Sequence, residues 1–147
     1  MWFAPIFVGI HSFFEHKFPI KKTHVIVNMF HMASVFMWNP GFVVSKSYFL
    51  ADFFLLYKNR HAYPGLWQLL LAHHVVSYAI LATEQENEDV DLALKWAEVS
   101  NLSLAVYELY PNTFTKTMRV IIYPWSRCVM LPMVLVESTK TLGVKAL

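Results

Sequence analysis

The chain has 147 residues, of which 56% are hydrophobic, 16% aromatic and only 15% charged, whereas a typical soluble domain has about 25% charged residues. This composition is typical of a membrane protein, and the length suits a single domain over residues 1–147. The formal net charge of +2 is too small to indicate a nucleic-acid partner, and the single cysteine excludes an internal disulfide.

Apolar blocks alternate with short polar segments along the chain, and each block has roughly the length that a helix needs to cross a bilayer. We expect these blocks to be helices, and the fold to be all-α: a multi-pass transmembrane bundle or barrel with about five to six spans. The blocks cover residues 1–14, 23–38, 42–57, 66–83, 90–110 and 114–131.

Proline, glycine and asparagine separate several blocks. Asn39-Pro40-Gly41 ends the second block, Pro111-Asn112 closes the fifth, and Pro124 interrupts the sixth. Several blocks are shorter than the usual twenty residues, which favours a thin bilayer such as the endoplasmic reticulum or another endomembrane. The alternative is a soluble helical protein, which would need polar residues alternating with apolar ones inside the blocks.

The charges of the connecting segments predict an orientation. The first, third and fifth connections carry seven lysines and arginines, whereas the second carries Lys46 and the fourth is acidic. Under the positive-inside rule, the odd connections are therefore expected on the cytosolic side. Lys140 and Lys145 do not fit this pattern, so the sixth block is expected to be re-entrant or a further span to be missing. The cations of the odd connections are Lys17, Lys21, Lys22, Lys58, Arg60, Lys116 and Arg119.

The fourth block, LWQLLLAHHVVSYAILAT, contains two adjacent histidines, His73 and His74, near its middle. An imidazole in hydrocarbon is costly unless it faces the interior of a bundle, finds a partner or lines a cavity. Consecutive residues lie about 100° apart around a helix, so the two rings are expected to meet different neighbours. Two packed, hydrogen-bonded histidines are the structural alternative to a functional pair.

Asp52 lies in the middle of the third block. A central aspartate costs roughly 2.5–3.5 kcal/mol on insertion, so its carboxylate must be protonated or paired. We expect an imidazole of a neighbouring helix to be its partner, with a purely structural Asp–His hydrogen bond as the alternative. His31, in the second block, is a further candidate or a core residue.

In the fifth block, Lys95, Glu98 and Asn101 follow one another at spacings of three and share one helix face, which is expected to point inward. Two roles stay open for Glu98: an ion pair with Lys95, or a second carboxylate near the histidines. No metal site is expected, because the histidine spacings do not bring ligands together; Ser77, for example, stands four residues after His73.

Several segments resemble the TLC domain family, which includes ceramide synthases and translocating-chain-associated membrane proteins. The resemblance covers roughly residues 23–132. It departs from ceramide synthases at Glu98 and Asn101, where those enzymes have two aspartates spaced by three. It also predicts a shortened or partial member. The matching segments are VIVNMFHMASVF, SYFLADFFLLY, LLLAHHVVSYAIL, WAEVSNLSL and SRCVMLP.

The resemblance implies a membrane protein that senses lipids or takes part in lipid homeostasis, and whose polar pocket binds the head group of a membrane lipid. The implied alternative is an acyl-CoA-dependent N-acyltransferase of ceramide-synthase type, with His73, His74 and Asp52 as catalytic residues, acyl-CoA as a substrate and no further cofactor. A shortened chain without activity is a third possibility. The expected pocket residues are His31, Asp52, His73, His74, Glu98 and Asn101.

Overall fold

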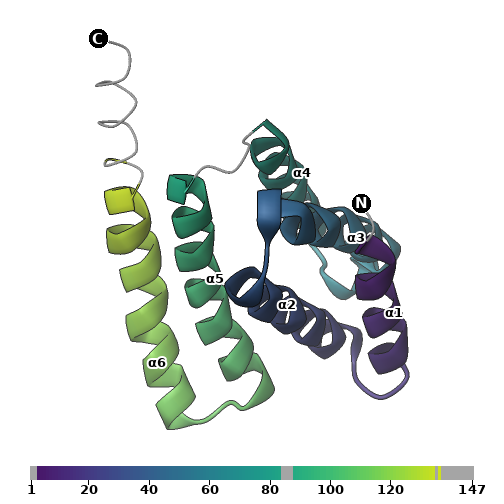
Figure 1. The fold of residues 1–147 in the computed structure, drawn as a ribbon. Helices are drawn as coiled ribbons and strands as arrows, with labels where there is room; N and C mark the ends of the chain where they lie inside the picture. Colours follow the sequence, from purple (N-terminus) through teal and green to yellow (C-terminus); the bar gives the residue numbers. More distant parts are fainter. Residues whose placement is uncertain (1–2, 84–87, 135, 137–147) are drawn as a thin grey trace. The chain divides into compact units, whose positions relative to one another are not determined.

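The computed structural model describes residues 3–83, 88–134 and 136. They form an all-α fold, as the sequence predicts, and each of the first five apolar blocks corresponds to one α-helix (Figure 1), whereas the sixth divides into an α-helix and a π-helix. Within these described ranges, no helix combines the length and the apolar character needed to cross a bilayer. The transmembrane spans therefore stay a prediction. The α-helices are α1 (Ala4–Glu15), α2 (Ile20–Met37), α3 (Val43–Lys58), α4 (Trp67–Thr83), α5 (Glu88–Leu109) and α6 (Thr113–Pro124).

Three shorter elements accompany these helices. The 3₁₀ turns η1 (Pro40–Phe42) and η2 (Arg60–Ala62) flank α3, and the π-helix η3 (Trp125–Met130) continues from α6. Proline has no backbone N–H and disturbs the hydrogen bonds of a helix interior. Pro124, at the end of α6, therefore accounts for the change from α- to π-helical hydrogen bonding.

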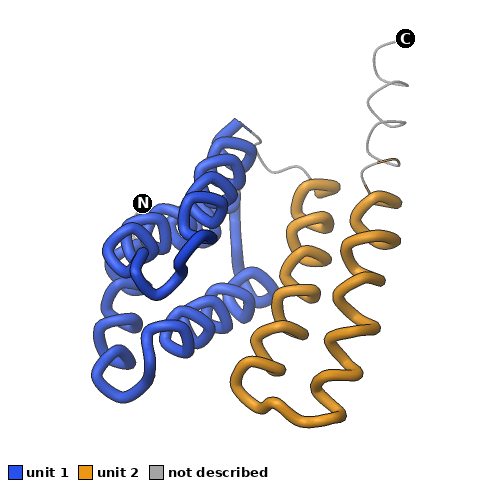
Figure 2. The backbone as a smooth tube through the Cα atoms, turned by 180° about the vertical axis from the view of Figure 1, so that it is seen from behind, with its two compact units in different colours: residues 1–86 blue, residues 87–147 orange. Residues whose placement is uncertain are grey.

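The helices form two compact units, residues 1–86 and residues 87–147 (Figure 2). In the first unit α3 is central, because it packs against α1, α2 and α4. Val27, Leu55 and Leu56 are among its buried apolar side chains. The same interior also buries the side chains of Asp52 and His74, so this unit has a polar centre inside an apolar shell.

The turn between α2 and α3 is held by the side chain of Asn39. Its Oδ1 accepts hydrogen bonds from the backbone N–H groups of Val44 (3.0 Å) and Ser45 (3.2 Å), which caps the start of α3. Phe42 adopts a left-handed conformation (φ 58°) immediately before α3, which is uncommon for a non-glycine residue. The buried ring of Phe42 is consistent with packing that holds this conformation.

The second unit is a hairpin in which α5 packs against α6 and η3 (Figures 1 and 2). Asn112 and Thr115 form a capping box at the start of α6, in which each side chain accepts a hydrogen bond from the other residue's backbone N–H. Arg119 stacks on the ring of Tyr107, 4.2 Å from its centroid. All of these contacts join described residues of the second unit.

Candidate functional site

Asp52, on α3, is the centre of the polar interior of the first unit and is only 5% exposed. Its Oδ1 lies 3.0 Å from Nδ1 of His24 on α2, and its Oδ2 lies 2.8 Å from Nε2 of His74 on α4. One carboxyl group therefore connects two imidazoles from two different helices. We refer to Asp52, His24 and His74 as the Asp52 cluster.

Both ring nitrogens of His74 are engaged. Nδ1 lies 2.8 Å from the backbone carbonyl oxygen of Leu70, and a carbonyl only accepts, so Nδ1 carries a hydrogen and donates it. The 2.8 Å contact between Nε2 and Asp52 needs one more proton. The pair is therefore either an imidazolium with a carboxylate or a neutral imidazole with a carboxylic acid.

His24 has one engaged and one open nitrogen. In either protonation state of the Asp52–His74 pair, Oδ1 of Asp52 accepts, so Nδ1 of His24 is the donor at 3.0 Å. Nε2 of His24 is buried and makes no hydrogen bond to the described residues. A neutral His24 ring then presents a lone pair at Nε2, which makes this atom the open acceptor of the cluster.

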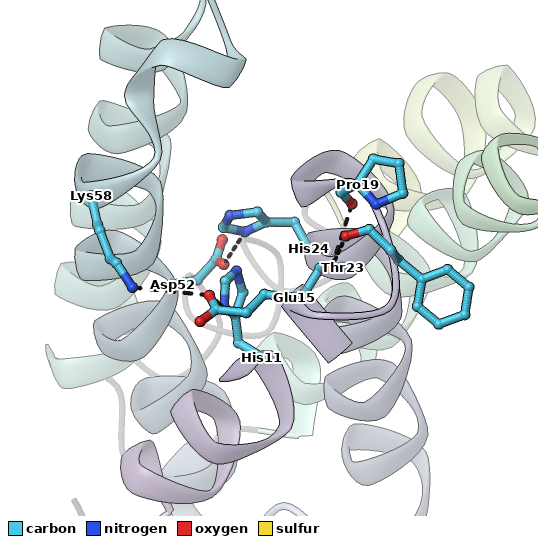
Figure 3. A network of polar contacts seen from close by, with 8 residues as sticks. His11, Glu15, Pro19, Thr23, His24, Asp52 and Lys58 are labelled. Carbon is cyan, nitrogen blue, oxygen red and sulfur yellow. Dashed lines mark hydrogen bonds and ion pairs between the residues drawn. The ribbon is translucent and has the colours of Figure 1, made fainter. Parts of the chain in front are cut away.

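A line of polar groups leads from His24 to the surface (Figure 3). The His11 ring, fully buried on α1, meets the His24 ring edge to face, with the centroids 4.8 Å apart. Nδ1 of His11 lies 3.2 Å from Oε2 of Glu15, and the same oxygen lies 3.9 Å from Nζ of Lys58, which is exposed. Titratable groups thus extend from the buried carboxyl to solvent.

Tyr63 covers His24 at one end of the unit. The two rings are in edge contact with centroids 5.7 Å apart, and Lys21 lies 5.8 Å from the Tyr63 centroid. Burial raises the pKa of the Tyr63 hydroxyl, and the nearby Asp52 carboxylate raises it further by a smaller amount. Tyr63 therefore stays neutral. The contacts Lys21–Tyr63 and Glu15–Lys58 show that the first and third connections lie at the same end of the unit. Because both connections carry lysine or arginine, this end is rich in cations.

His31 forms a second polar group beside the α2–α3 turn. Its Nε2 lies 3.0 Å from Oγ of Ser45, which also accepts a hydrogen bond from Nδ2 of Asn39 at 2.9 Å. The ring stacks on Tyr48 with centroids 4.0 Å apart. These contacts fit the core role that the sequence left open for His31.

The adjacent histidines of α4 differ in their surroundings. His74 is buried in the cluster, whereas the side chain of His73 is exposed and contacts the rings of Phe49 and His74. The reason is the rotation of about 100° between consecutive residues of a helix, which points the His74 ring toward Asp52 and leaves the His73 ring at the edge of the contact with α3. The structure does not bring His73 into the cluster.

Glu98 and Asn101 belong to the second unit and form a polar group with Arg127. Glu98 is 3% exposed and accepts a hydrogen bond from Nδ2 of Asn101 at 3.2 Å. Arg127 donates through Nη2 to Oδ1 of Asn101 (3.2 Å) and through Nε to Oγ of Ser100 (2.8 Å). Lys95, one of the two partners that the sequence left open for Glu98, pairs with Asp91 at 2.6 Å. The structure thus links Glu98 to Asn101 within the hairpin.

Comparisons with known proteins find no match: no family model, curated sequence or solved structure is similar to this chain. Among the residues that the structure describes, no three histidine, cysteine, aspartate or glutamate side chains are arranged to hold a metal ion. The TLC-like motifs therefore stay a resemblance, and the candidate site is judged on its own chemistry.

The sequence reasoning missed His24, His11 and Tyr63. A signal was present for His24, because it precedes His31 by seven residues, which is two helical turns and the same face of α2. No comparable signal existed for His11 or Tyr63. Their proximity to the cluster depends on how α1 and the segment before α4 pack on α3.

Proposed function

We propose that this chain is a TLC-type membrane protein that senses lipids or takes part in lipid homeostasis. In this proposal, the Asp52 cluster binds the polar head group of a lipid. The observation that carries the proposal is the buried Asp52 carboxyl between two imidazoles, His24 and His74. Buried ionisable groups inside an apolar helical assembly are candidates for function by default. The open Nε2 of His24 offers such a head group a hydrogen-bond acceptor.

Exposed apolar side chains support contact with lipid. Helix α4 contains no aspartate, glutamate, lysine or arginine, and Leu69 is 68% exposed on it, with Val75, Val76 and Ile80 also exposed. Large contiguous apolar patches are uncommon on soluble monomers and mark interaction sites, including membrane sites. The predicted arrangement of five to six spans in the endoplasmic reticulum or another endomembrane is part of this proposal.

Lipid binding is tested by quantifying the lipids that copurify with the protein in mild detergent, by mass spectrometry. The Asp52→Ala variant, which removes both contacts to imidazoles, is expected to lose the lipid. The Asp52→Asn variant retains a hydrogen-bonding group at this position and is expected to keep it. Glu108→Ala alters an exposed carboxylate and is the matched control. Equal lipid content in all four proteins, or none in the wild type, would reject the proposal.

Membrane insertion is tested separately by alkaline carbonate extraction of membranes from expressing cells. A multi-pass protein stays in the membrane pellet, because its helices are buried in hydrocarbon. Release of the full-length chain into the supernatant would exclude the predicted spans. Lipid binding by the Asp52 cluster would then be judged on the copurification experiment alone.

One observation favours a second function, an acyl-CoA-dependent N-acyltransferase. Asp52 holds an imidazole through Nδ1, as the acid of a catalytic triad does, and a base with a pKa near 6.5 suits proton transfer at neutral pH. An imidazole of the cluster would remove a proton from a sphingoid amine while the amine nitrogen attacks the thioester carbonyl. The carbon–sulfur bond then breaks, and the proton passes to the leaving thiolate.

The two functions are distinguished by an assay with a sphingoid base and labelled acyl-CoA. Acylated product that disappears in His24→Ala and persists in His73→Ala would support the enzyme, because Asp52 holds His24 through Nδ1 while the side chain of His73 is exposed. Lipid copurification without product would support the lipid-binding protein. The absence of both would reject both functions.

A further inference from the structure

The two imidazoles bound to Asp52 are not equivalent. His74 uses Nε2 toward Asp52 and Nδ1 toward the Leu70 carbonyl. His24 uses Nδ1 toward Asp52, and its Nε2 is buried without a hydrogen bond to any described residue. Within the Asp52 cluster, Nε2 of His24 is therefore the nitrogen that is open to a ligand, although both nitrogens of the neighbouring His11 ring also lack a hydrogen bond to the described residues.

An open acceptor at this position is costly. The His24 side chain is more than nine-tenths buried, and a buried polar atom without a partner loses its hydrogen bonds to water without replacement. The great majority of such atoms in folded proteins have a partner, and each exception calls for an explanation. A ligand that donates a hydrogen bond to Nε2 would satisfy it.

We propose that Nε2 of His24 accepts a hydrogen bond from a donor group of the bound lipid, such as a hydroxyl, and that His74 acts through Asp52 as a positioning residue. The inference rests on the lipid binding proposed above and assigns the contact atom. It assigns the ligand contact to His24 of α2 rather than to the histidine pair of α4. His73, whose side chain is exposed on α4, has no part in it.

The position of His24 indicates where a ligand would enter. His24 lies in the second turn of α2, beneath the ring of Tyr63. Tyr63 belongs to the short segment between η2 and α4, where Gly65 has φ +77°. We therefore place the entry of a lipid head group at the Tyr63 ring, whose displacement would uncover one side of the His24 ring.

The test compares two ligands that differ in one donor, a long-chain alcohol and its methyl ether. Their affinities are measured with the purified full-length protein in detergent micelles, by tryptophan fluorescence, for the wild type and for His24→Asn. The amide introduced by this substitution is able to donate to Asp52 in place of Nδ1 but has no atom at the position of Nε2. The preference for the alcohol over the ether is expected to fall about fivefold in the variant, the worth of one hydrogen bond.

Two controls separate this contact from general effects. His61→Asn changes an exposed histidine of η2 and should leave the preference unchanged. His74→Gln retains a donor toward Asp52 and should weaken or preserve the binding of both ligands equally. Partitioning into micelles is common to all variants, so it cancels from the comparison.

The outcomes are distinguishable. If the wild type binds neither ligand, the proposed lipid binding fails and the inference fails with it. If the wild type binds both and His24→Asn retains the full preference, lipid binding stands and the inference is overturned. A preference lost in His74→Gln but kept in His24→Asn also overturns it.

A measurement on the wild type alone tests the inference even if a variant does not fold. Nitrogen NMR of labelled histidine reports whether an unprotonated imidazole nitrogen accepts a hydrogen bond. One such resonance is expected to move on addition of the alcohol and to stay in place with the ether. Identical spectra with the two ligands would overturn the inference.

Discussion

Oδ2 of Asp52 and Nε2 of His74 lie 2.8 Å apart and share one proton, because the other ring nitrogen of His74 already donates to the Leu70 carbonyl. The contact joins α3 to α4, and the second carboxyl oxygen joins α3 to α2 through His24. The stability of the first unit should therefore depend on the hydrogen-bonding capacity of residue 52.

Two substitutions at Asp52 separate hydrogen bonding from charge. Asp52→Ala leaves the nitrogens of His24 and His74 buried without their partner, which should lower the free energy of unfolding by about 3 kcal/mol. Asp52→Asn presents an oxygen to His24 and an N–H to the neutral His74 ring, so its loss should be much smaller. Chemical denaturation followed by circular dichroism measures both. Equal losses would show that the charge is the stabilising element.

The neighbouring histidines of α4 should respond differently to alanine. His74→Ala removes a buried ring and a partner of Asp52, with an expected loss of about 2 kcal/mol. His73→Ala alters an exposed side chain and should change stability by no more than about 0.5 kcal/mol. Thermal unfolding of the two variants under identical conditions makes the comparison, and a larger effect of His73→Ala would contradict the assigned orientation of α4.

Gly9 and Gly65 form a matched pair for backbone conformation. A Cβ at either position meets nothing within 4 Å, so substitution tests the backbone alone. Gly65 has φ +77°, and Gly65→Ala should destabilise the protein by about 1 kcal/mol. Gly9 lies inside α1, and Gly9→Ala should stabilise it by about 0.5–1 kcal/mol. Effects of the same sign in unfolding experiments would be inconsistent with this geometry.

Arg127→Lys should loosen the second unit. The guanidinium donates to Ser100 through Nε and to Asn101 through Nη2, and a single ammonium does not reproduce this fork. Amide hydrogen exchange should become faster in η3 and in the facing turn of α5. Arg60→Lys, at an exposed position of η2, is the control and should leave exchange in the hairpin unchanged. Unaltered protection after Arg127→Lys would show that these bonds are dispensable.

The sequence predicted the helices well, because their ends depend on local signals. Pro40 follows the end of α2, and Asn112 caps α6. It also singled out Asp52 and both histidines of α4, His73 and His74, since polar groups within apolar blocks need partners. The structure joins Asp52 to His74.

Other features depend on tertiary packing and were not predictable. Helix α4 is apolar around most of its circumference, so no pattern in its sequence indicated which of His73 and His74 faces α3. The link between Glu98, Asn101 and Arg127 depends on the packing of η3 against α5. The π-helical hydrogen bonding after Pro124 was likewise not foreseen, although the interruption was.

Ser45, Tyr48 and Asp52 follow one another along a single stripe of α3 at intervals of three and four residues. Through this stripe the helix contacts His31, His24 and His74 simultaneously. A small axial rotation of α3 would disturb all of these contacts together, so the stripe sets the angular position of α3 against both neighbours.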